Sequence, residues 1–263
     1  MGILNVTPDS FFDGGRYFDQ QSALERARQM VEGGAAIIDV GGESTRPGSD
    51  PVATEDEIRR VVPVIEAIGK HLDVAISIDT KKSAVMKAAL GAGAHLINDV
   101  RALQEPGALE VAAQSGAAVC LMHMQGDPKT MQQEPHYVNV VAEVTGFLRN
   151  RIAACETAGI DRGRILIDPG IGFGKGLEHN LALLAATRTL ASALVPVLIG
   201  VSRKSMFGKL LARVPEERVA GGIAAATAAA LAGAKVIRTH DVRETVDAVK
   251  VASALRAHGY ASQ

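Results

Sequence analysis

The chain has 263 residues, of which 47% are apolar, and a formal net charge of -1. Its charges form no basic or acidic block, which argues against a nucleic-acid surface or an anionic membrane surface. This length permits a well-buried core, and we expect one domain over residues 1–263. Cys120 and Cys155 are far apart and lie in no C-x-x-C motif, and there is no signal-like start and no run of about 18 apolar residues. We therefore expect a soluble cytoplasmic protein.

Short apolar runs alternate with segments of helical periodicity along the whole chain, and glycine or polar residues follow each run. Strands are predicted at residues 3–5, 37–40, 74–78, 96–97, 117–122, 165–167, 197–201 and 235–237. Helices are predicted at residues 22–33, 54–68, 82–92, 105–115, 137–158, 177–193, 216–232 and 242–255. Thr54 and Glu57 have the spacing of a capping box, and Asp241 is expected to cap the last helix.

About eight strand-then-helix units predict a TIM (β/α)8 barrel, an α/β fold. An open doubly wound sheet is the alternative. Polar residues stand at or just after the predicted strand ends, and a closed barrel would bring them to one mouth, whereas an open sheet would spread them apart. They are Asn5, Asp39, Asp79, Asn98, His123, Asp168, Lys204 and Arg238. The barrel is therefore favoured.

Long loops are expected after strands 1, 2 and 5, at residues 6–19, 43–49 and 125–135. The first of them gathers several of the chain's few aromatic residues. It could be a surface loop packed on its own phenylalanines or a mobile lid over a site, and the sequence leaves both open.

Four polar residues at predicted strand ends, Asp79, Asn98, Asp168 and Lys204, could form one buried set. Buried carboxylates need partners. Together these side chains would complement a planar heterocycle with adjacent N–H donors and a carbonyl, such as the pyrimidinone edge of a pterin or guanine. A salt-bridge network in the barrel core is the alternative interpretation, and four such residues at one mouth favour a site.

Arg238 and His240 follow the last predicted strand and precede a helix, which is where TIM barrels commonly bind phosphate. Arg46 and Asn5 are expected to face the same mouth. A hydrogen-bonded loop histidine is the simpler interpretation of His240, but the neighbouring arginine favours an anion site.

Glycines at every second position from Gly170 to Gly176 match neither a dinucleotide fingerprint nor a P-loop. We interpret them as a tight turn beside a ligand, with Phe173 available for stacking. Cys120 is expected to be a buried small residue rather than a nucleophile. No residue cluster has zinc-type spacing, and no convincing Ser-His-Asp or Cys-His set is found.

Six motifs, in order over nearly the whole chain, resemble those of bacterial dihydropteroate synthase. They are G-I-L-N-V-T-P-D-S-F at residues 2–11, D-V-G-G-E-S-T-R-P-G at 39–48, I-N-D-V-R at 97–101, C-L-M-H-M-Q-G at 120–126, D-P-G-I-G-F-G-K at 168–175 and S-R-K-S at 202–205. The resemblance implies a TIM barrel, usually dimeric, and a folate-pathway transferase. Such an enzyme joins 6-hydroxymethyl-7,8-dihydropterin diphosphate to 4-aminobenzoate and releases pyrophosphate, and sulfonamides are expected competitors. The chain starts almost within its first strand, where family members carry a preceding segment, so we expect either a shortened start or a differently sealed lower rim.

The same resemblance implies a role for each matching residue. The pterin would be held by Asp79, Asn98, Asp168, Lys204, Phe173 and Met122. The diphosphate would be held by Asn5, Arg46, Arg238 and His240, of which Arg46, Arg238 and His240 would be catalytic and Asn5 would ligate Mg²⁺. The 4-aminobenzoate would be surrounded by Thr45, Pro47, Ser205 and Phe11.

Three other interpretations are considered. A pterin-dependent methyltransferase barrel would share the pterin site but would need neither the loop at residues 44–48 nor the diphosphate cluster. A non-catalytic pterin-binding paralogue predicts damage at Asn5, Arg238 or the loops, which the sequence does not show. An unrelated phosphate-handling isomerase would require a poised Glu or Lys base.

Overall fold

The computed structural model describes residues 1–7, 20–44, 49–127, 130–131 and 134–260. Within these residues it contains eight parallel β-strands. They are β1 (Gly2–Asn5), β2 (Ile37–Gly41), β3 (Ala75–Asp79), β4 (Leu96–Asp99), β5 (Ala118–Met122), β6 (Ile165–Asp168), β7 (Leu198–Gly200) and β8 (Val236–Arg238). Every predicted strand is present, with ends shifted by at most two residues.

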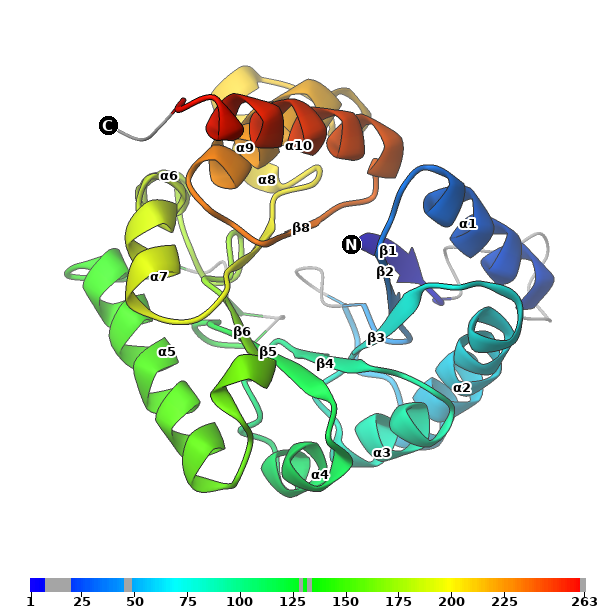
Figure 1. Cartoon of the computed structure of the whole chain (residues 1–263). Helices are drawn as coiled ribbons and strands as arrows, with labels where there is room; N and C mark the ends of the chain where they lie inside the picture. The colour runs from blue at the N-terminus through cyan, green and yellow to red at the C-terminus, as the bar shows by residue number, and fades with distance from the viewer. Residues whose placement is uncertain (8–19, 45–48, 128–129, 132–133, 261–263) are drawn as a thin grey trace.

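The strands close into a barrel. Strands β1 to β6 pair in chain order as one sheet, and β7 pairs with β8. Two isolated parallel bridges, Gly2 with Thr239 and Ile167 with Val197, join the pair to the two edges of the larger sheet. Figure 1 shows the strands at the centre and the helices around them. The predicted barrel is confirmed, and the open sheet is excluded.

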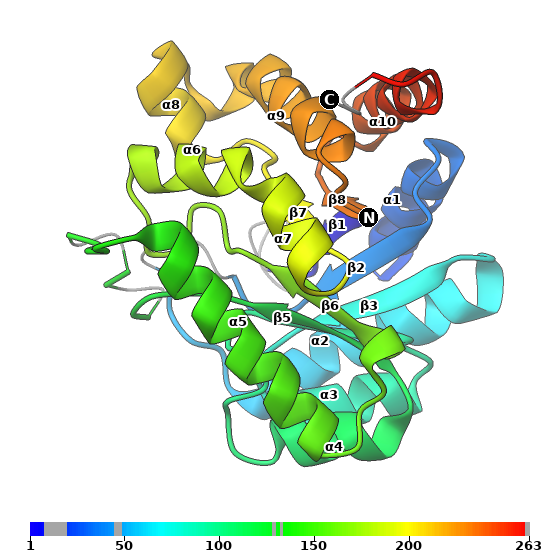
Figure 2. The ribbon, with the colours of Figure 1, turned by 60° about the vertical axis from the view of Figure 1, so that its left-hand side comes forward.

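The helices form the outer ring, as the two views in Figures 1 and 2 show. In the described part of the chain they are α1 (Gln20–Glu32), α2 (Thr54–His71), α3 (Ser83–Gly91), α4 (Ala108–Ser115), α5 (Val140–Thr157), α6 (Leu177–Ala185), α7 (Thr187–Ala193), α8 (Ser205–Leu211), α9 (Val219–Leu231) and α10 (Val242–Ala257). Two short 3-10 turns are at Arg162–Arg164 and Pro215–Glu217.

The main core lies between the sheet and this ring. Helix α2 buries Val61, Val64, Ile65 and Ile68, whose spacing puts them on one face of the helix. The strands present fully buried residues such as Ile38 to the helices. Alternate strand residues face the barrel interior, where polar side chains such as Asp39 are found.

Three details of the predicted helices are wrong. The helix expected at residues 177–193 is two helices, which meet at Ala186. Helix α8 (Ser205–Leu211) was not predicted, because seven residues give too short a pattern to recognise. The helix expected from residue 216 begins at Val219, after a 3-10 turn.

Two predicted helix caps are also wrong, because the side chains have partners elsewhere in the structure. Helix α2 begins at Thr54 after Ala53, without a side-chain cap, and Glu57 binds Lys82 instead. Asp241 stands at the start of α10, but its carboxylate binds Arg203 rather than the helix backbone. In both places an ion pair takes the carboxylate that a cap would use.

Among the described residues, none of the helices combines the length and the apolar composition that crossing a membrane would require.

Candidate active site

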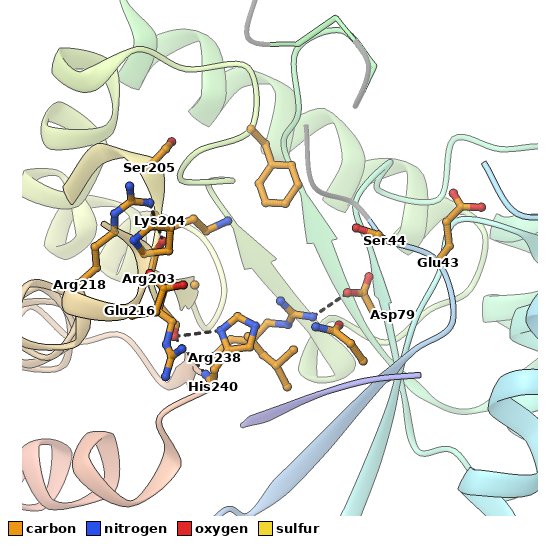
Figure 3. Close-up of a pocket in the computed structure, with 16 residues that line it drawn as sticks. Glu43, Ser44, Asp79, Arg203, Lys204, Ser205, Glu216, Arg218, Arg238 and His240 are labelled. Carbon is orange, nitrogen blue, oxygen red and sulfur yellow. Dashed lines mark hydrogen bonds and ion pairs between the residues drawn. The ribbon is translucent and has the colours of Figure 1, made fainter. Parts of the chain in front are cut away.

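A cavity of about 500 Å³ opens at the carboxyl ends of the strands. It is lined by residues within or just after β1, β2, β3, β6, β7 and β8, by the start of α8 and by the turn before α9, so segments far apart in the sequence meet there. Figure 3 shows Lys204, Arg238 and His240 on one side, with Asp79 and Glu43 opposite. Predicted strand-end residues therefore converge on one mouth.

Arg238, at the end of β8, is bound to two carboxylates across the barrel. Its Nε donates to Asp39 Oδ2 at 2.6 Å and its Nη2 to Asp79 Oδ2 at 2.6 Å. Asn98 Nδ2 donates to the same oxygen of Asp39 at 3.0 Å. Burial lowers the pKa of Arg238, but the two carboxylates raise it more, so the net shift is upward and the guanidinium keeps its charge.

The carboxylates of this network retain unused acceptor atoms. Oδ1 of Asp39 and Oδ1 of Asp79 are buried without a hydrogen-bond partner among the described residues. Burial raises the pKa of Asp79, while Arg238 opposes the shift. Buried polar atoms are almost always hydrogen-bonded, so the free oxygen of Asp79, a residue that lines the cavity, is a place for a ligand N–H donor.

Lys204 extends into the cavity over an aromatic ring. Its Nζ lies 4.1 Å from the centre of the Phe173 ring, a cation–π distance. Burial lowers the pKa of Lys204 to about 8, opposed by Asp168. Asp168 accepts the Gly170 N–H on Oδ1 at 2.7 Å and lies next to Gly200, which lines the cavity. A flat ligand could contact the aromatic face, the ammonium and the carboxylates together.

His240 is held by a serine that the sequence analysis did not single out. Ser202 Oγ lies 3.0 Å from His240 Nδ1 and accepts the His240 backbone N–H at 3.1 Å. Ser202 also donates to Asp241, whose carboxylate binds Arg203. These contacts fix the imidazole at the rim of the cavity, beside Arg238 (Figure 3).

Lys175 is a buried cation just below the site. Its Nζ donates to Phe173 O at 2.9 Å and His123 O at 3.3 Å, and it lies 3.0 Å from His123 Nδ1. Burial lowers the pKa of Lys175 to about 7 and that of His123 to about 3. His123 is therefore neutral, and its Nδ1 can accept from the ammonium. Lys175 thus ties the turn that carries Phe173 to the end of β5.

The predicted site residues fall into three groups. Lining the cavity are Asn5, Asp79, Phe173, Lys204, Ser205, Arg238 and His240. Adjoining it or buried near it are Asn98, Asp168 and Met122, of which Met122 is only 4% exposed at the end of β5. Outside the described residues are Phe11, Thr45, Arg46 and Pro47.

Asp39 was noted only as one of the polar strand residues, and the structure places it at the centre of the network. It lies within β2 rather than at its end, and it is fully buried. An aspartate inside a β-branched strand was the available signal, since such a residue needs a partner. Arg203 and Arg218, which also line the cavity, follow β7 and carried no comparable signal.

The described residues contain no group of three or more His, Cys, Asp or Glu side chains that could hold a metal ion. Cys120 and Cys155 are buried free thiols, and burial raises the pKa of each. The expectation that Cys120 is a buried small residue is confirmed.

The family model described as "Pterin binding enzyme" matches residues 1–240. The dihydropteroate synthase of Escherichia coli (strain K12) is 54% identical over 254 residues, which cover 97% of this chain and 90% of that protein. The Haemophilus influenzae dihydropteroate synthase is 49% identical, over 95% of this chain and 91% of its own length.

Solved structures agree with these relatives. A Yersinia pestis dihydropteroate synthase in a sulfonamide drug complex superposes with a TM-score of 0.93 at 52% identity, covering 97% of this chain and 93% of that one. A Xanthomonas albilineans dihydropteroate synthase with 4-aminobenzoic acid gives a TM-score of 0.92 at 50% identity, over 97% and 92% of the two chains.

The barrel and the polar set at its mouth define a pterin-binding enzyme, as the matched family model states. With relatives near 50% identity over almost its whole length, the chain belongs to the dihydropteroate synthase family. It is accordingly a transferase of folate biosynthesis.

Proposed function

We propose that this site joins 6-hydroxymethyl-7,8-dihydropterin diphosphate to 4-aminobenzoate and releases pyrophosphate. The observation that carries the proposal is the meeting, in one cavity, of hydrogen-bonding groups suited to a pterin edge with cations suited to a diphosphate. Asp79 and Lys204 supply the first kind of group, and Arg238 and His240 the second.

The pterin edge is assigned to the buried polar set. Asp79 and Asp168 accept its N–H groups, Asn98 and Lys204 donate, and the ring lies against Phe173. Met122 closes the apolar side. The unpartnered oxygen of Asp79 and the position of the Lys204 ammonium over the Phe173 ring support this assignment.

The diphosphate is assigned to Asn5, Arg46, Arg238 and His240. Arg238 uses Nε and Nη2 on the two aspartates, and Nη1 makes no hydrogen bond to any residue in the described ranges. That leaves one donor edge for the anion. Arg238 therefore has two tasks, because it also holds Asp79 in place for the pterin.

Magnesium fits this site as a companion of the diphosphate. Asn5 lines the cavity and offers one neutral amide oxygen, and the described residues form no group of three or more His, Cys, Asp or Glu side chains that could hold a metal ion instead. Mg²⁺ prefers oxygen ligands and usually retains waters beside one or two protein ligands and substrate phosphates. Bound there, it would supply charge neutralisation to the diphosphate.

The reaction breaks the bond between the pterin methylene carbon and the diphosphate oxygen. The bonding electrons leave with the oxygen, and the electron-rich pterin stabilises the cation left at the methylene. Arg238, His240 and Arg46 stabilise the charge that develops on the departing pyrophosphate. The arylamine nitrogen then bonds to the methylene and loses a proton to water, so no strong general base is required.

The arylamine pocket is assigned to Ser205 with Thr45, Pro47 and Phe11. Ser205 lines the cavity at the first residue of α8, and its hydroxyl can donate a hydrogen bond to the carboxylate of 4-aminobenzoate. Relatives were solved with 4-aminobenzoic acid and with a sulfonamide drug, and we extend both ligands to this chain.

We also propose that residues 1–263 form one pterin-binding domain and that the enzyme is a cytoplasmic homodimer that contacts neither nucleic acid nor membrane. Two buried free cysteines support a reducing compartment. Exposed apolar side chains, including Val251 and Leu255 on α10, support association. Sedimentation equilibrium of the whole chain tests the dimer, and a monomer at micromolar concentration would refute it.

Substitutions in the two substrate pockets test the assignment. In Ser205→Ala, the KM for 4-aminobenzoate should rise about 10-fold while the KM for the pterin diphosphate stays within about 2-fold, because one hydrogen bond to a carboxylate is lost. In Asp168→Asn, the KM for the pterin diphosphate should rise while the KM for 4-aminobenzoate stays nearly unchanged. Dihydropteroate formation is the readout.

Three results would oppose the proposal. Equal effects of both variants on both KM values would refute the division into two pockets. A wild-type chain that binds pterins but forms no dihydropteroate would favour a non-catalytic paralogue. Methyl transfer to a corrinoid would favour the methyltransferase barrel.

A further inference from the structure

Lys82 lies just before α3, outside the lining of the main cavity. The ammonium of Lys82 has three N–H donors, and three neighbouring oxygen atoms accept from it. Nζ donates to Glu43 Oε2, Glu57 Oε2 and Val52 O, each at 2.6 Å. The side chain therefore joins the end of β2, the chain just before α2, and α2 itself.

Two of these acceptors stand at opposite ends of the loop that follows β2. Glu43 opens the loop and Val52 closes it, and they are joined directly because Val52 N donates to Glu43 Oε2 at 2.9 Å. A second hydrogen bond joins two residues that lie between Glu43 and Val52 in the chain, since Ser49 Oγ donates to Ser44 O at 2.5 Å. Lys82 thus fastens both ends of the loop at one point.

The fastening depends on the positive charge. Glu57 is 1% exposed at its side chain and Glu43 is 13% exposed, and one oxygen of each binds the same nitrogen. Burial lowers the pKa of Lys82, but hydrogen bonds to the two glutamates raise it more, so the net shift is upward. Without the lysine, two carboxylates would face each other in a poorly solvated place and would separate or take up a proton.

The loop ends belong to the wall of the catalytic cavity. Glu43 and Ser44 line it, and Figure 3 shows them across the cavity from Ser205. Displacement of Glu43 would move this wall relative to the arylamine pocket. The hydrogen bonds from Arg238 to Asp79 and from Gly170 to Asp168, which hold two of the pterin groups, do not involve Lys82.

We propose that Lys82 is a positioning residue for the transferase reaction, which fixes both ends of the loop after β2 and thereby the wall that faces 4-aminobenzoate. The inference rests on the proposed function, and it assigns Lys82 no contact with substrate. Its effect passes through Glu43 and Val52.

Lys81 provides a matched control. It neighbours Lys82 in sequence, and its Nζ lies 3.6 Å from Glu43 Oε1. The Lys81 side chain is more exposed, at 28% against 19% for Lys82, and within the described residues it pairs with Glu43 but not with Val52 or Glu57. Lys81→Met removes the same charge at nearly the same place but leaves the loop ends fastened.

The experiment compares wild type, Lys82→Met and Lys81→Met as full chains in steady-state assays, with equilibrium binding of a pterin alongside. In Lys82→Met the KM for 4-aminobenzoate should rise about 10-fold or more, while the KM for the pterin diphosphate and the pterin Kd change less than about 3-fold. Lys81→Met should stay within about 2-fold of wild type. Lys82→Arg, which keeps the charge and several donors, should recover part of the loss.

A purely structural role would lower the melting temperature of Lys82→Met but leave both KM values unchanged, and that result would overturn the proposal. So would equal rises in both KM values. If Lys82→Met does not fold, Glu43→Gln carries the test, because Lys82 still pairs with Glu57 and the same KM split is expected. Failure of the proposed function is distinct, since wild type itself would then form no dihydropteroate.

Discussion

At the scale of single residues, Lys175 shows how the site depends on a buried charge. Its ammonium has no carboxylate among its hydrogen-bond partners and is held by Phe173 O and by the backbone and ring of His123. These three acceptors match the three N–H donors of Lys175. Because one of the acceptors is the carbonyl oxygen of Phe173, Lys175 helps to fix the position of Phe173. The energetic cost appears in the lowered pKa, about 7.

That pKa predicts a pH-dependent stability. The unfolded lysine titrates near 10.4, so between about pH 7 and pH 10 the unfolded chain binds a proton that the folded chain has released. The cost of the buried charge is fully present below pH 7 and is relieved as pH rises. Relative to Lys175→Met, the free energy of unfolding of the wild type should increase by up to about 1.4 kcal/mol per pH unit in this window.

Urea unfolding of both chains between pH 6.5 and pH 9.5 measures the difference between their free energies of unfolding. The contributions of titrating groups common to both chains largely cancel in this difference. A difference that does not change with pH would mean that Lys175 already titrates normally in the fold. A difference of the opposite sign would contradict the burial argument outright.

At the scale of elements, the turn after β6 is pressed against the end of β5. Gly170 has φ of +70°, and a Cβ there would lie 1.9 Å from His123 O. Gly174 has φ of +61°, and its Cβ would lie 2.4 Å from Gln125 O. Only glycine permits this close approach of two backbones, and the approach places Phe173 beside Lys204.

Gly170→Ala should therefore destabilise the fold by more than about 3 kcal/mol, because the clash is with backbone and cannot be relieved by a side-chain movement. Gly159→Ala is the matched control. Its φ of +92° is also positive, but nothing lies within 4 Å of the added Cβ, so it should cost only about 1 kcal/mol. Chemical denaturation gives both values, and equal costs would show that backbone strain alone matters.

At the scale of the whole molecule, the barrel divides the charges of the mouth between two units. The six-stranded sheet carries Asp39, Asp79 and Asp168, while Lys204 follows β7 and Arg238 ends β8. The pair β7–β8 joins the larger sheet through isolated bridges, and the ion pairs of Arg238 span the same junction. The network that prepares the site therefore also helps to close the barrel.

The barrel was predictable from sequence because its evidence is local. Each strand is a short apolar run before polar residues, and the repetition of this unit fixes the fold class. The convergence of Asp79, Lys204 and Arg238 then follows from the topology alone.

What the sequence could not supply was the choice of partners. Glu57 was expected to cap α2, but it binds Lys82, and Asp241 binds Arg203 instead of its own helix. Arg238 was assigned to the diphosphate, and nothing local revealed its bonds to two aspartates more than 150 residues away. Such choices depend on distances across the closed barrel, which periodicity does not encode.

The most direct test of the account is pyrophosphate release from the pterin diphosphate in a single turnover, with and without Mg²⁺ and 4-aminobenzoate. The account predicts release that requires Mg²⁺, is stimulated by 4-aminobenzoate and is matched by dihydropteroate formed. Tight binding of the pterin diphosphate without release, or release at the same rate when Mg²⁺ is chelated, would contradict the claim that the cations of this mouth and the metal together expel the diphosphate.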